Sequence, residues 1–288
     1  MKIPISVIIL TYNEESIIED CFKSVVDWVS EIIVVDSYST DGTLKIAERY
    51  GAKIFQHPFE NFSQQRNWAL NNLTIENEWI LNLDADQRIT QELKKELITI
   101  FSNPINPIIN GFLMSRRTIF MGRWIKHGGH YPVYHAPLFR KGFGFFEDRL
   151  YDQHFIVNGK TKILKGDIID IIADSLTRFT ERHNKWSNSE VEEQLYKNNQ
   201  LSGRKLIKGN IFGDKREKRR ALRNFYHHLP LFSRAFFYFI YRYFFRLGFL
   251  DGKEGLIFHF LQGFWYRFLV DAKLFEIKRV GIEKSIKV

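Results

Sequence analysis

Strand-like and helix-like segments alternate over residues 5–101, and this alternation is the feature that most constrains the fold. Short β-branched, apolar runs predict strands at 5–10, 31–36, 53–56 and 79–83. Apolar residues recurring at helical spacing predict helices at 17–26, 44–50, 63–70 and 93–101. Strands separated by helices in this rhythm are typical of a doubly wound, mostly parallel, Rossmann-like α/β sheet. The sequence therefore predicts an α/β domain, to which we assign residues 1–200.

Polar side chains follow three of the predicted strands at their carboxyl ends, where sheets of this class bind ligands. Glu14 follows the first strand, Asp36 ends the second, and Asp84 and Asp86 follow the fourth. Carboxylates gathered at one edge repel each other unless they share a positive charge, so we expect a divalent cation there. Residues i and i+2 of an extended chain face the same way, and their hard oxygens suit Mg²⁺ or Mn²⁺ holding a diphosphate. A solvated turn at the strand end is the alternative interpretation.

Four segments of this half of the chain resemble the motifs of family 2 glycosyltransferases. Residues 4–14 are similar to the family's opening strand, and residues 33–43 to its second strand followed by Ser-x-Asp-Gly-Thr. Residues 65–69 resemble its Arg-Asn helix motif, and 83–86 (Leu-Asp-Ala-Asp) its metal-binding motif. The stretch 110–200 more loosely resembles the lipopolysaccharide core β-glucosyltransferase subgroup.

The resemblance implies a GT-A fold and transfer of a sugar from a nucleotide-diphosphate donor. It also implies roles for individual residues, which contact the nucleoside, the uracil base, the diphosphate, the ribose or the metal. Thr11 and Glu14 would contact the nucleoside, Asp36 the uracil base and Arg66 the diphosphate. Asp84 would lie at the ribose or at the metal's water shell, and Asp86 would bind the metal together with Asp84. The residue chemistry agrees, because an aspartate accepts from a base N–H and an arginine matches phosphate geometry. A surface arginine on a helix is the alternative for Arg66.

Inverting transfer needs a carboxylate that takes the proton of the acceptor hydroxyl. Residues 145–150 resemble the Glu-Asp pair that supplies this base in the family. We favour Asp148, with Glu147 and Asp152 as alternatives, and expect aromatic neighbours to desolvate the carboxyl and raise its pKa. A purely structural ion pair of Asp148 with a nearby arginine is the competing interpretation. The processive motif Gln-x-x-Arg-Trp is missing, which favours addition of a single sugar.

The end of the chain is basic and aromatic. Residues 203–246 hold twelve Lys and Arg against two acids, although the whole chain carries only +9. Arg234, Arg242 and Arg246 interrupt the apolar run 231–246, which argues against a transmembrane helix. Cations on one face and aromatic rings on the other predict a helix lying in the interface of an anionic membrane, with 258–268 alongside. Packing within the protein or an oligomer is the alternative, and a nucleic-acid partner is disfavoured.

These patterns together predict an inverting, metal-dependent hexosyltransferase that uses a nucleotide-sugar, a UDP-sugar in our interpretation. The acceptor would be a lipid-linked or lipopolysaccharide-type glycan of the cell envelope. The single cysteine, Cys21, and an N-terminus without a signal pattern favour the cytoplasm, with peripheral attachment to the inner face of the cell membrane. Residues 201–288 would form the helical, membrane-associating region. A nucleotidyltransferase that activates a sugar phosphate and a non-catalytic membrane-surface module are the alternatives. Zinc at His127, His130 and His135 is disfavoured against acceptor-loop or structural roles.

Overall fold

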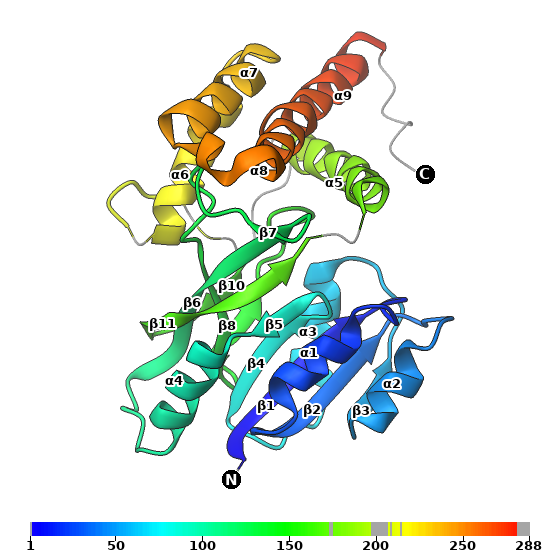
Figure 1. The fold of residues 1–288 in the computed structure, drawn as a ribbon, viewed down its shortest axis with the longest axis vertical. Helices are drawn as coiled ribbons and strands as arrows, with labels where there is room; N and C mark the ends of the chain where they lie inside the picture. Colours follow the sequence, from blue (N-terminus) through cyan, green and yellow to red (C-terminus); the bar gives the residue numbers. More distant parts are fainter. Residues whose placement is uncertain (1, 173–174, 197–206, 208, 214, 281–288) are drawn as a thin grey trace. The chain divides into compact units, whose positions relative to one another are not determined.

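The computed structural model describes residues 2–172, 175–196, 207, 209–213 and 215–280 (Figure 1). The chain divides into two compact units. The first unit contains Met1–Arg117, Val133–Glu147 and Gln153–Ile171, and the second contains Thr118–Pro132, Asp148–Asp152 and Ile172–Val288. Our predicted boundary between residues 200 and 201 lies outside the described residues and stays a prediction.

The N-terminal part of the first unit has the predicted strands and helices in the predicted order. Its strands β1 to β4 form a parallel sheet in the order β3-β2-β1-β4, and span Ile3–Thr11, Val29–Asp36, Lys53–Gln56 and Trp79–Asp84. The helices α1 to α4 span Ile18–Val25, Thr43–Arg49, Phe62–Asn72 and Gln91–Phe101. Asn61 caps α3 by accepting a hydrogen bond from the Gln64 amide, so the helix begins one residue before the predicted start at 63.

Alternate residues of β1 are buried on opposite faces of the sheet. Val7 and Ile9 pack in one core with side chains of α1, α2 and α4, whereas Ile8 and Leu10 pack in another with α3 and strand β10 (Phe155–Val157). Both faces are therefore covered, which is why the run reads as continuously apolar. Each fully buried aliphatic side chain contributes about 1.5–3 kcal/mol relative to exposure.

Beyond β4 the sheet contains antiparallel pairs, β4 with β8, β8 with β6 and β11 with β5, which the strand–helix rhythm of the first hundred residues did not reveal. The order continues β4-β8-β6-β11-β5, and β9 pairs with β10 in a separate two-stranded sheet. These strands are β5 Gln87–Ile89, β6 Ile109–Phe120, β8 Tyr134–Arg140, β9 Gly144–Phe146 and β11 Lys160–Ile171. The sheet is thus mixed. β6 and β8 pair antiparallel, because the connection between them contains no helix and a parallel pair needs a long crossover connection.

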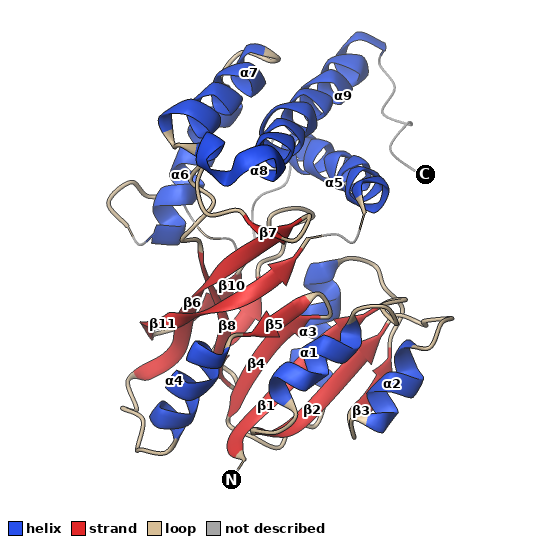
Figure 2. Cartoon of the chain, in the orientation of Figure 1, coloured by secondary structure: helices blue, strands red, loops and turns tan. Residues whose placement is uncertain are grey.

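The second unit is mainly helical, as predicted for the end of the chain (Figure 2). It has the short strand β7 (Arg123–Trp124) and the helices α5 Leu176–Tyr196, α6 Lys215–His228, α7 Ser233–Ile240, α8 Gly252–Phe258 and α9 Tyr266–Val280. Two π-helical segments, η1 Tyr241–Phe245 and η3 His259–Trp265, and the 3₁₀ turn η2 Gly248–Asp251 connect the last helices. Among the helices that the structure describes, none combines the length and the hydropathy that crossing a bilayer demands.

The arginines of the apolar run do not form the exposed cationic face that the sequence suggested. Arg234 is buried and its Nε donates to Asp271 Oδ1 at 2.8 Å, while the buried Arg242 donates from Nε to the Gly128 carbonyl at 2.8 Å. Only Arg246 of the three is exposed. The predicted cationic face is wrong because helical periodicity shows which residues share a face of the helix. It does not show whether distant segments supply buried hydrogen-bond acceptors for them.

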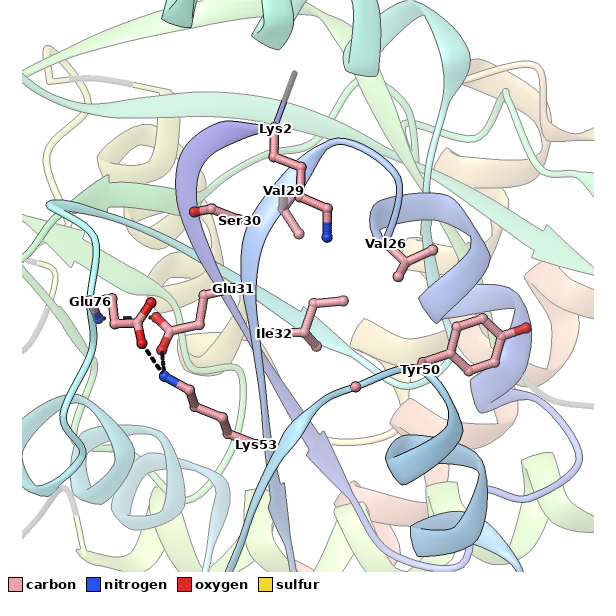
Figure 3. A pocket seen from close by; sticks show the side chains of 10 residues that line it. Lys2, Val26, Val29, Ser30, Glu31, Ile32, Tyr50, Lys53 and Glu76 are labelled. Carbon is pink, nitrogen blue, oxygen red and sulfur yellow. Dashed lines mark hydrogen bonds and ion pairs between the residues drawn. The ribbon is translucent and has the colours of Figure 1, made fainter.

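A buried glutamate at the amino ends of the first strands links three of them. Glu31 of β2 accepts hydrogen bonds from Ser6 of β1 and from the Glu76 amide at 3.0 Å, and its Oε1 lies 2.6 Å from Lys53 Nζ of β3. Lys53 also pairs with the exposed Glu76, and the three side chains line the shallow pocket of Figure 3. Burial alone would raise the pKa of Glu31, but these hydrogen bonds hold it below its ordinary value.

Replacing Glu31 by glutamine is expected to lower the free energy of unfolding at neutral pH by about 1–3 kcal/mol. Because the folded-state pKa of Glu31 is depressed, its contribution is complete above the unfolded-state pKa and is lost as the pH falls through the folded-state value. Denaturant unfolding at several pH values should therefore show a shallower acid dependence in Glu31→Gln. The exposed Glu76→Gln is the control, with an effect below about 1 kcal/mol. Equal losses in both variants would contradict this account.

Candidate active site

The strand register brings three predicted site residues to one edge of the sheet. Thr11 is the partner of Asp36 across β1 and β2, and Leu10 is the partner of Asp84 across β1 and β4. Thr11, Asp36 and Asp84 therefore lie on adjacent strands, at their carboxyl ends. The pocket of Figure 3 lies at the opposite, amino ends of the same strands and includes none of these residues.

Asp36 is fully buried and joins the ends of three strands. Its Oδ1 accepts from the Thr11 hydroxyl at 2.9 Å and from the Ser39 hydroxyl at 2.5 Å. Its Oδ2 accepts from the Ser39 amide at 2.8 Å and from the Gln56 amide group at 3.2 Å. Four donors compensate the cost of burying this carboxylate. The predicted contact of Asp36 with a base is not tested by these bonds and stays a prediction.

The loops that follow β1 and β2 are joined by hydrogen bonds from side chain to backbone. The Asn13 amide donates to Ser39 Oγ at 2.9 Å, and Asn13 Oδ1 accepts from the Thr40 amide at 2.8 Å. The Glu14 amide donates to Thr43 Oγ1 at 2.8 Å. Asn13 has a positive φ of 53°, which an asparagine tolerates better than most residues. The first loop is thus held in one conformation against the second.

The remaining members of the Ser-x-Asp-Gly-Thr motif have equally local roles. Asp41 accepts from the Thr43 amide at 3.0 Å and from the Glu15 amide at 3.2 Å. The Gly42 amide donates to Glu15 Oε2 at 2.9 Å, and a Cβ on Gly42 would lie 2.4 Å from the Glu15 carboxylate. A larger residue at this position would displace the end of the exposed Glu15 side chain and cost its hydrogen bond to the Gly42 amide. Burial opposes ionisation of Asp41, yet hydrogen bonds from Thr43 and Glu15 hold its pKa below the ordinary value.

Asp84 is held by a buried arginine. Arg66 of α3 is only 3% exposed, which rules out the surface position, and its Nη2 lies 2.5 Å from Asp84 Oδ1 and 2.8 Å from the Leu83 carbonyl oxygen. Burial lowers the pKa of the Arg66 guanidinium, and the negative charge of Asp84 opposes that shift. The positive charge that we expected a cation to supply is thus supplied in part by Arg66. Contact of Arg66 with a diphosphate stays a prediction.

Gln87 is a site residue that the sequence analysis missed. Its side-chain nitrogen donates to Asp84 Oδ2 at 3.1 Å, and its Oε1 accepts from the Asp84 amide at 3.2 Å. Together with Arg66 it orients both oxygens of Asp84, whose side chain is 44% exposed. The only signal in the sequence was the i, i+3 spacing from Asp84, which is typical of a tight turn.

Asp84 and Asp86 could hold a divalent cation. Both are carboxylates at the end of β4, and both are partly exposed. Within the described ranges, no cluster of three or more His, Cys, Asp or Glu side chains could form a metal cage by itself. Mg²⁺ in nucleotide sites is characteristically held by one or two carboxylates, with phosphate oxygens and water as the other ligands. The donor set therefore fits a cation that arrives with a diphosphate.

The three candidates for the catalytic base differ in their surroundings. Glu147 is completely buried, and its Oε2 lies 3.7 Å from His154 Nδ1. Asp152 pairs with two arginines of α6, Arg220 at 3.1 Å and Arg223. Asp148 belongs to the second unit and is exposed. The expected desolvation of Asp148 by its aromatic neighbours is therefore wrong, because their rings do not cover it.

The three histidines near residue 130 have structural partners. In the second unit, His127 Nδ1 lies 2.6 Å from Asp251 Oδ1, and His130 Nε2 lies 2.8 Å from Thr118 Oγ1. In the first unit, His135 stacks on His154 with ring centroids 5.4 Å apart. The described residues around them include no zinc-binding cluster.

The fold and this edge define an α/β domain whose sheet presents carboxylates and two interlocked loops at the carboxyl ends of its parallel strands. The family model described as glycosyl transferase family 2 matches residues 6–157, which is just over half of the chain. The chain therefore belongs to family 2 of the glycosyltransferases, and it has the GT-A fold that the motifs implied.

Several relatives carry glycosyltransferase names. An uncharacterized glycosyltransferase of Rickettsia felis is 43% identical over 99 residues, or 34% of each chain. The glycosyltransferase RP128 of Rickettsia prowazekii is 27% identical over 285 residues, 94% of this chain and 86% of its own. The lipopolysaccharide core biosynthesis glycosyltransferase LpsC of Rhizobium meliloti is 29% identical over 126 residues, 42% and 45% of the two chains. The chain spans about a third of the length of its relatives from R. felis, R. bellii, R. conorii and R. typhi.

Solved structures show weaker likeness. A structure of S. aureus TarS 1-349 is 17% identical with a TM-score of 0.44, and the match covers 98% of this chain and 92% of that one. Glucosyl-3-phosphoglycerate synthase from Mycobacterium tuberculosis, solved with Mn²⁺ and UDP, is 22% identical with a TM-score of 0.33 over 41% of this chain and 44% of its own.

Proposed function

We propose that this chain transfers a single sugar, with inversion, from a UDP-sugar to a lipid-linked or lipopolysaccharide-type glycan. The observation that carries the proposal is the row of Thr11, Asp36 and Asp84 on adjacent strand ends, beside two loops held together by hydrogen bonds. Membership of family 2 supports the reaction class. The name of the LpsC relative supports the glycan class.

The donor would bind at this carboxyl edge. Thr11, Glu14 and Asp36 would contact the nucleoside, since the first loop and the end of β2 lie side by side there. Asp84 would reach the ribose or the metal's water shell, in the orientation that Arg66 and Gln87 impose on its carboxylate. Arg66 thereby acts on the donor through Asp84, and a direct contact with the diphosphate is the further role we assign to it.

Asp86, with Asp84, would hold Mg²⁺ or Mn²⁺ together with the diphosphate oxygens. Such a cation, when bound, neutralises the negative charge that develops on the leaving diphosphate. The two carboxylates are the contribution of this chain, because they are partly exposed at the strand end where the donor would lie.

Asp148 is the base that we propose for the acceptor hydroxyl. It would take the hydroxyl proton as that oxygen attacks the anomeric carbon and the bond to the diphosphate breaks. Its exposure leaves the carboxylate accessible, whereas Glu147 is buried and Asp152 is paired with two guanidinium groups. As part of the same proposal, the reaction takes place in the cytoplasm at the inner face of the membrane, where a lipid-linked acceptor would be presented.

Calorimetry with UDP tests the donor site directly. UDP is expected to bind at least about tenfold more tightly with Mn²⁺ than without it, because the cation bridges the carboxylates and the diphosphate. A screen of nucleotide-sugars should then find one that is hydrolysed only in the presence of the metal. Equal binding with and without Mn²⁺ would contradict the site. Release of pyrophosphate from a nucleoside triphosphate would instead identify a nucleotidyltransferase.

A further inference from the structure

The last helices of the second unit expose many aromatic rings. Between residues 236 and 275, nine Phe and Tyr side chains are at least 41% exposed. We call them the aromatic surface: Phe236, Phe237, Tyr241, Phe244, Phe245, Phe249, Phe260, Phe268 and Phe275. They come from α7, η1, η2, η3 and α9, the segments drawn from gold through orange to red in Figure 1. Single exposed rings are ordinary on protein surfaces, but a continuous group of them marks an interaction site.

Ring contacts join five of these nine rings into one group, Phe244, Phe249, Phe260, Phe268 and Phe275. Neighbouring centroids lie 5.1–6.3 Å apart along a chain that crosses from α9 to α7 and on to η2. The chain runs through Phe275, Phe232, Phe268, Phe264, Phe260, Phe239, Tyr243 and Phe249, with Phe244 also against Tyr243. Partly buried rings in this chain support the exposed ones, so the surface is held in place by packing.

The buried arginines explain how the rings come to face outward. Arg234 of α7 pairs with Asp271 of α9, and both side chains are almost completely buried. Arg242 donates to Gln262 of η3 at 3.1 Å as well as to the Gly128 carbonyl. These polar groups occupy the inner side of the helices. The rings are left on the outer side.

We propose that the aromatic surface inserts into the interfacial layer of an anionic lipid bilayer. Phe and Tyr side chains on amphipathic helices favour the boundary between headgroups and acyl chains. Between residues 231 and 279 four basic side chains are exposed against the single exposed acid Glu276, namely Arg246, Lys253, Lys278 and Arg279. The Arg279 guanidinium lies 5.9 Å from the Phe275 ring, so charge and rings occur together. Anionic headgroups complement this charge.

A second copy of the chain fits the surface less well than a membrane does. A symmetric dimer would bring the same exposed cations of both copies together, which is unfavourable without intervening anions. The inference rests on the proposed function in one respect: membrane binding would bring the enzyme to its lipid-linked acceptor. The aromatic rings, rather than the arginines of the apolar run, are the inserting groups.

Flotation of the full chain with vesicles tests the proposal. Binding is expected to vesicles of phosphatidylcholine with phosphatidylglycerol, and to be weaker with phosphatidylcholine alone. The double variant Phe244→Ser/Phe245→Ser should bind anionic vesicles at least about tenfold more weakly, because two rings of the aromatic surface are removed. The control is Phe59→Ser/Phe62→Ser, which removes two exposed rings from the first unit and should leave vesicle binding unchanged.

Sedimentation and donor hydrolysis without vesicles complete the test. The proposal would be overturned by a wild-type chain that fails to float, by equal losses in the two double variants, or by a dimer that Phe244→Ser/Phe245→Ser dissociates. Metal-dependent hydrolysis of the donor sugar should be the same in wild type and in both variants. A wild-type chain that hydrolyses the donor but does not float would contradict the membrane-binding proposal and leave the proposed function intact. A wild-type chain that floats but does not hydrolyse the donor would contradict the proposed function and leave the membrane-binding proposal intact.

Discussion

Replacing Asp86 by alanine is expected to reduce metal-dependent sugar transfer by about a thousandfold or more, since the leaving diphosphate would lose its counter-charge. The fold should be retained. Asp86 is partly exposed at the strand end, and its backbone carbonyl keeps the bond from the Ile171 amide at 3.1 Å. Transfer assays across Mn²⁺ concentrations, together with calorimetry of UDP binding, would measure the loss. Thermal unfolding should show little change.

The control for this experiment is Asp20→Ala, which removes an acidic side chain from helix α1 of the same unit. The Asp20 side chain is 65% exposed. Its transfer rate and UDP affinity should match those of the wild type. Full activity of Asp86→Ala, or equal losses in both variants, would refute a role of Asp86 in holding the metal.

Replacing Asp148 by asparagine is expected to lower kcat for transfer by about 10²–10⁴-fold while UDP still binds, because the amide cannot accept the acceptor proton. Since Asp148 is exposed, the free energy of unfolding should change by no more than about 0.5 kcal/mol. The measurement is the steady-state rate of transfer, compared with calorimetric binding of UDP and Mn²⁺. Donor affinity should be unchanged.

Asp152→Asn is the matched variant, because it makes the same chemical change four residues away. It leaves Arg220, only 3% exposed on its side chain, without the carboxylate partner that it shares with Arg223. We expect it to lower the free energy of unfolding by about 1–3 kcal/mol, and kcat only as far as the folded fraction falls. Loss of transfer in Asp152→Asn at unchanged stability, with Asp148→Asn active, would transfer the role of base to Asp152. Glu147→Gln tests the third candidate in the same way.

The first half of the fold could be predicted because its signals are local. A strand buried on both faces is apolar along most of its length, as in β1 and β2, and a helix such as α1 is apolar at one spacing. Short connections place the consecutive strands β1 and β2 side by side, which brings Thr11 next to Asp36, whereas Asp84 joins them because β4 pairs with β1 and not with β3. The strands β6, β8 and β11 escaped prediction because no helix separates them and each pairs with a distant segment.

The sequence by itself determined which residues reach the carboxyl edge and that the last helices are aromatic and basic. Only the tertiary structure decided what surrounds those residues. Arg66 lies beneath Asp84 rather than at the surface, and Arg234 and Arg242 turn inward to Asp271 and Gly128 while rings face outward. The physical reason is that a buried charge must find its partner, and the partner is set by segments far away in the chain.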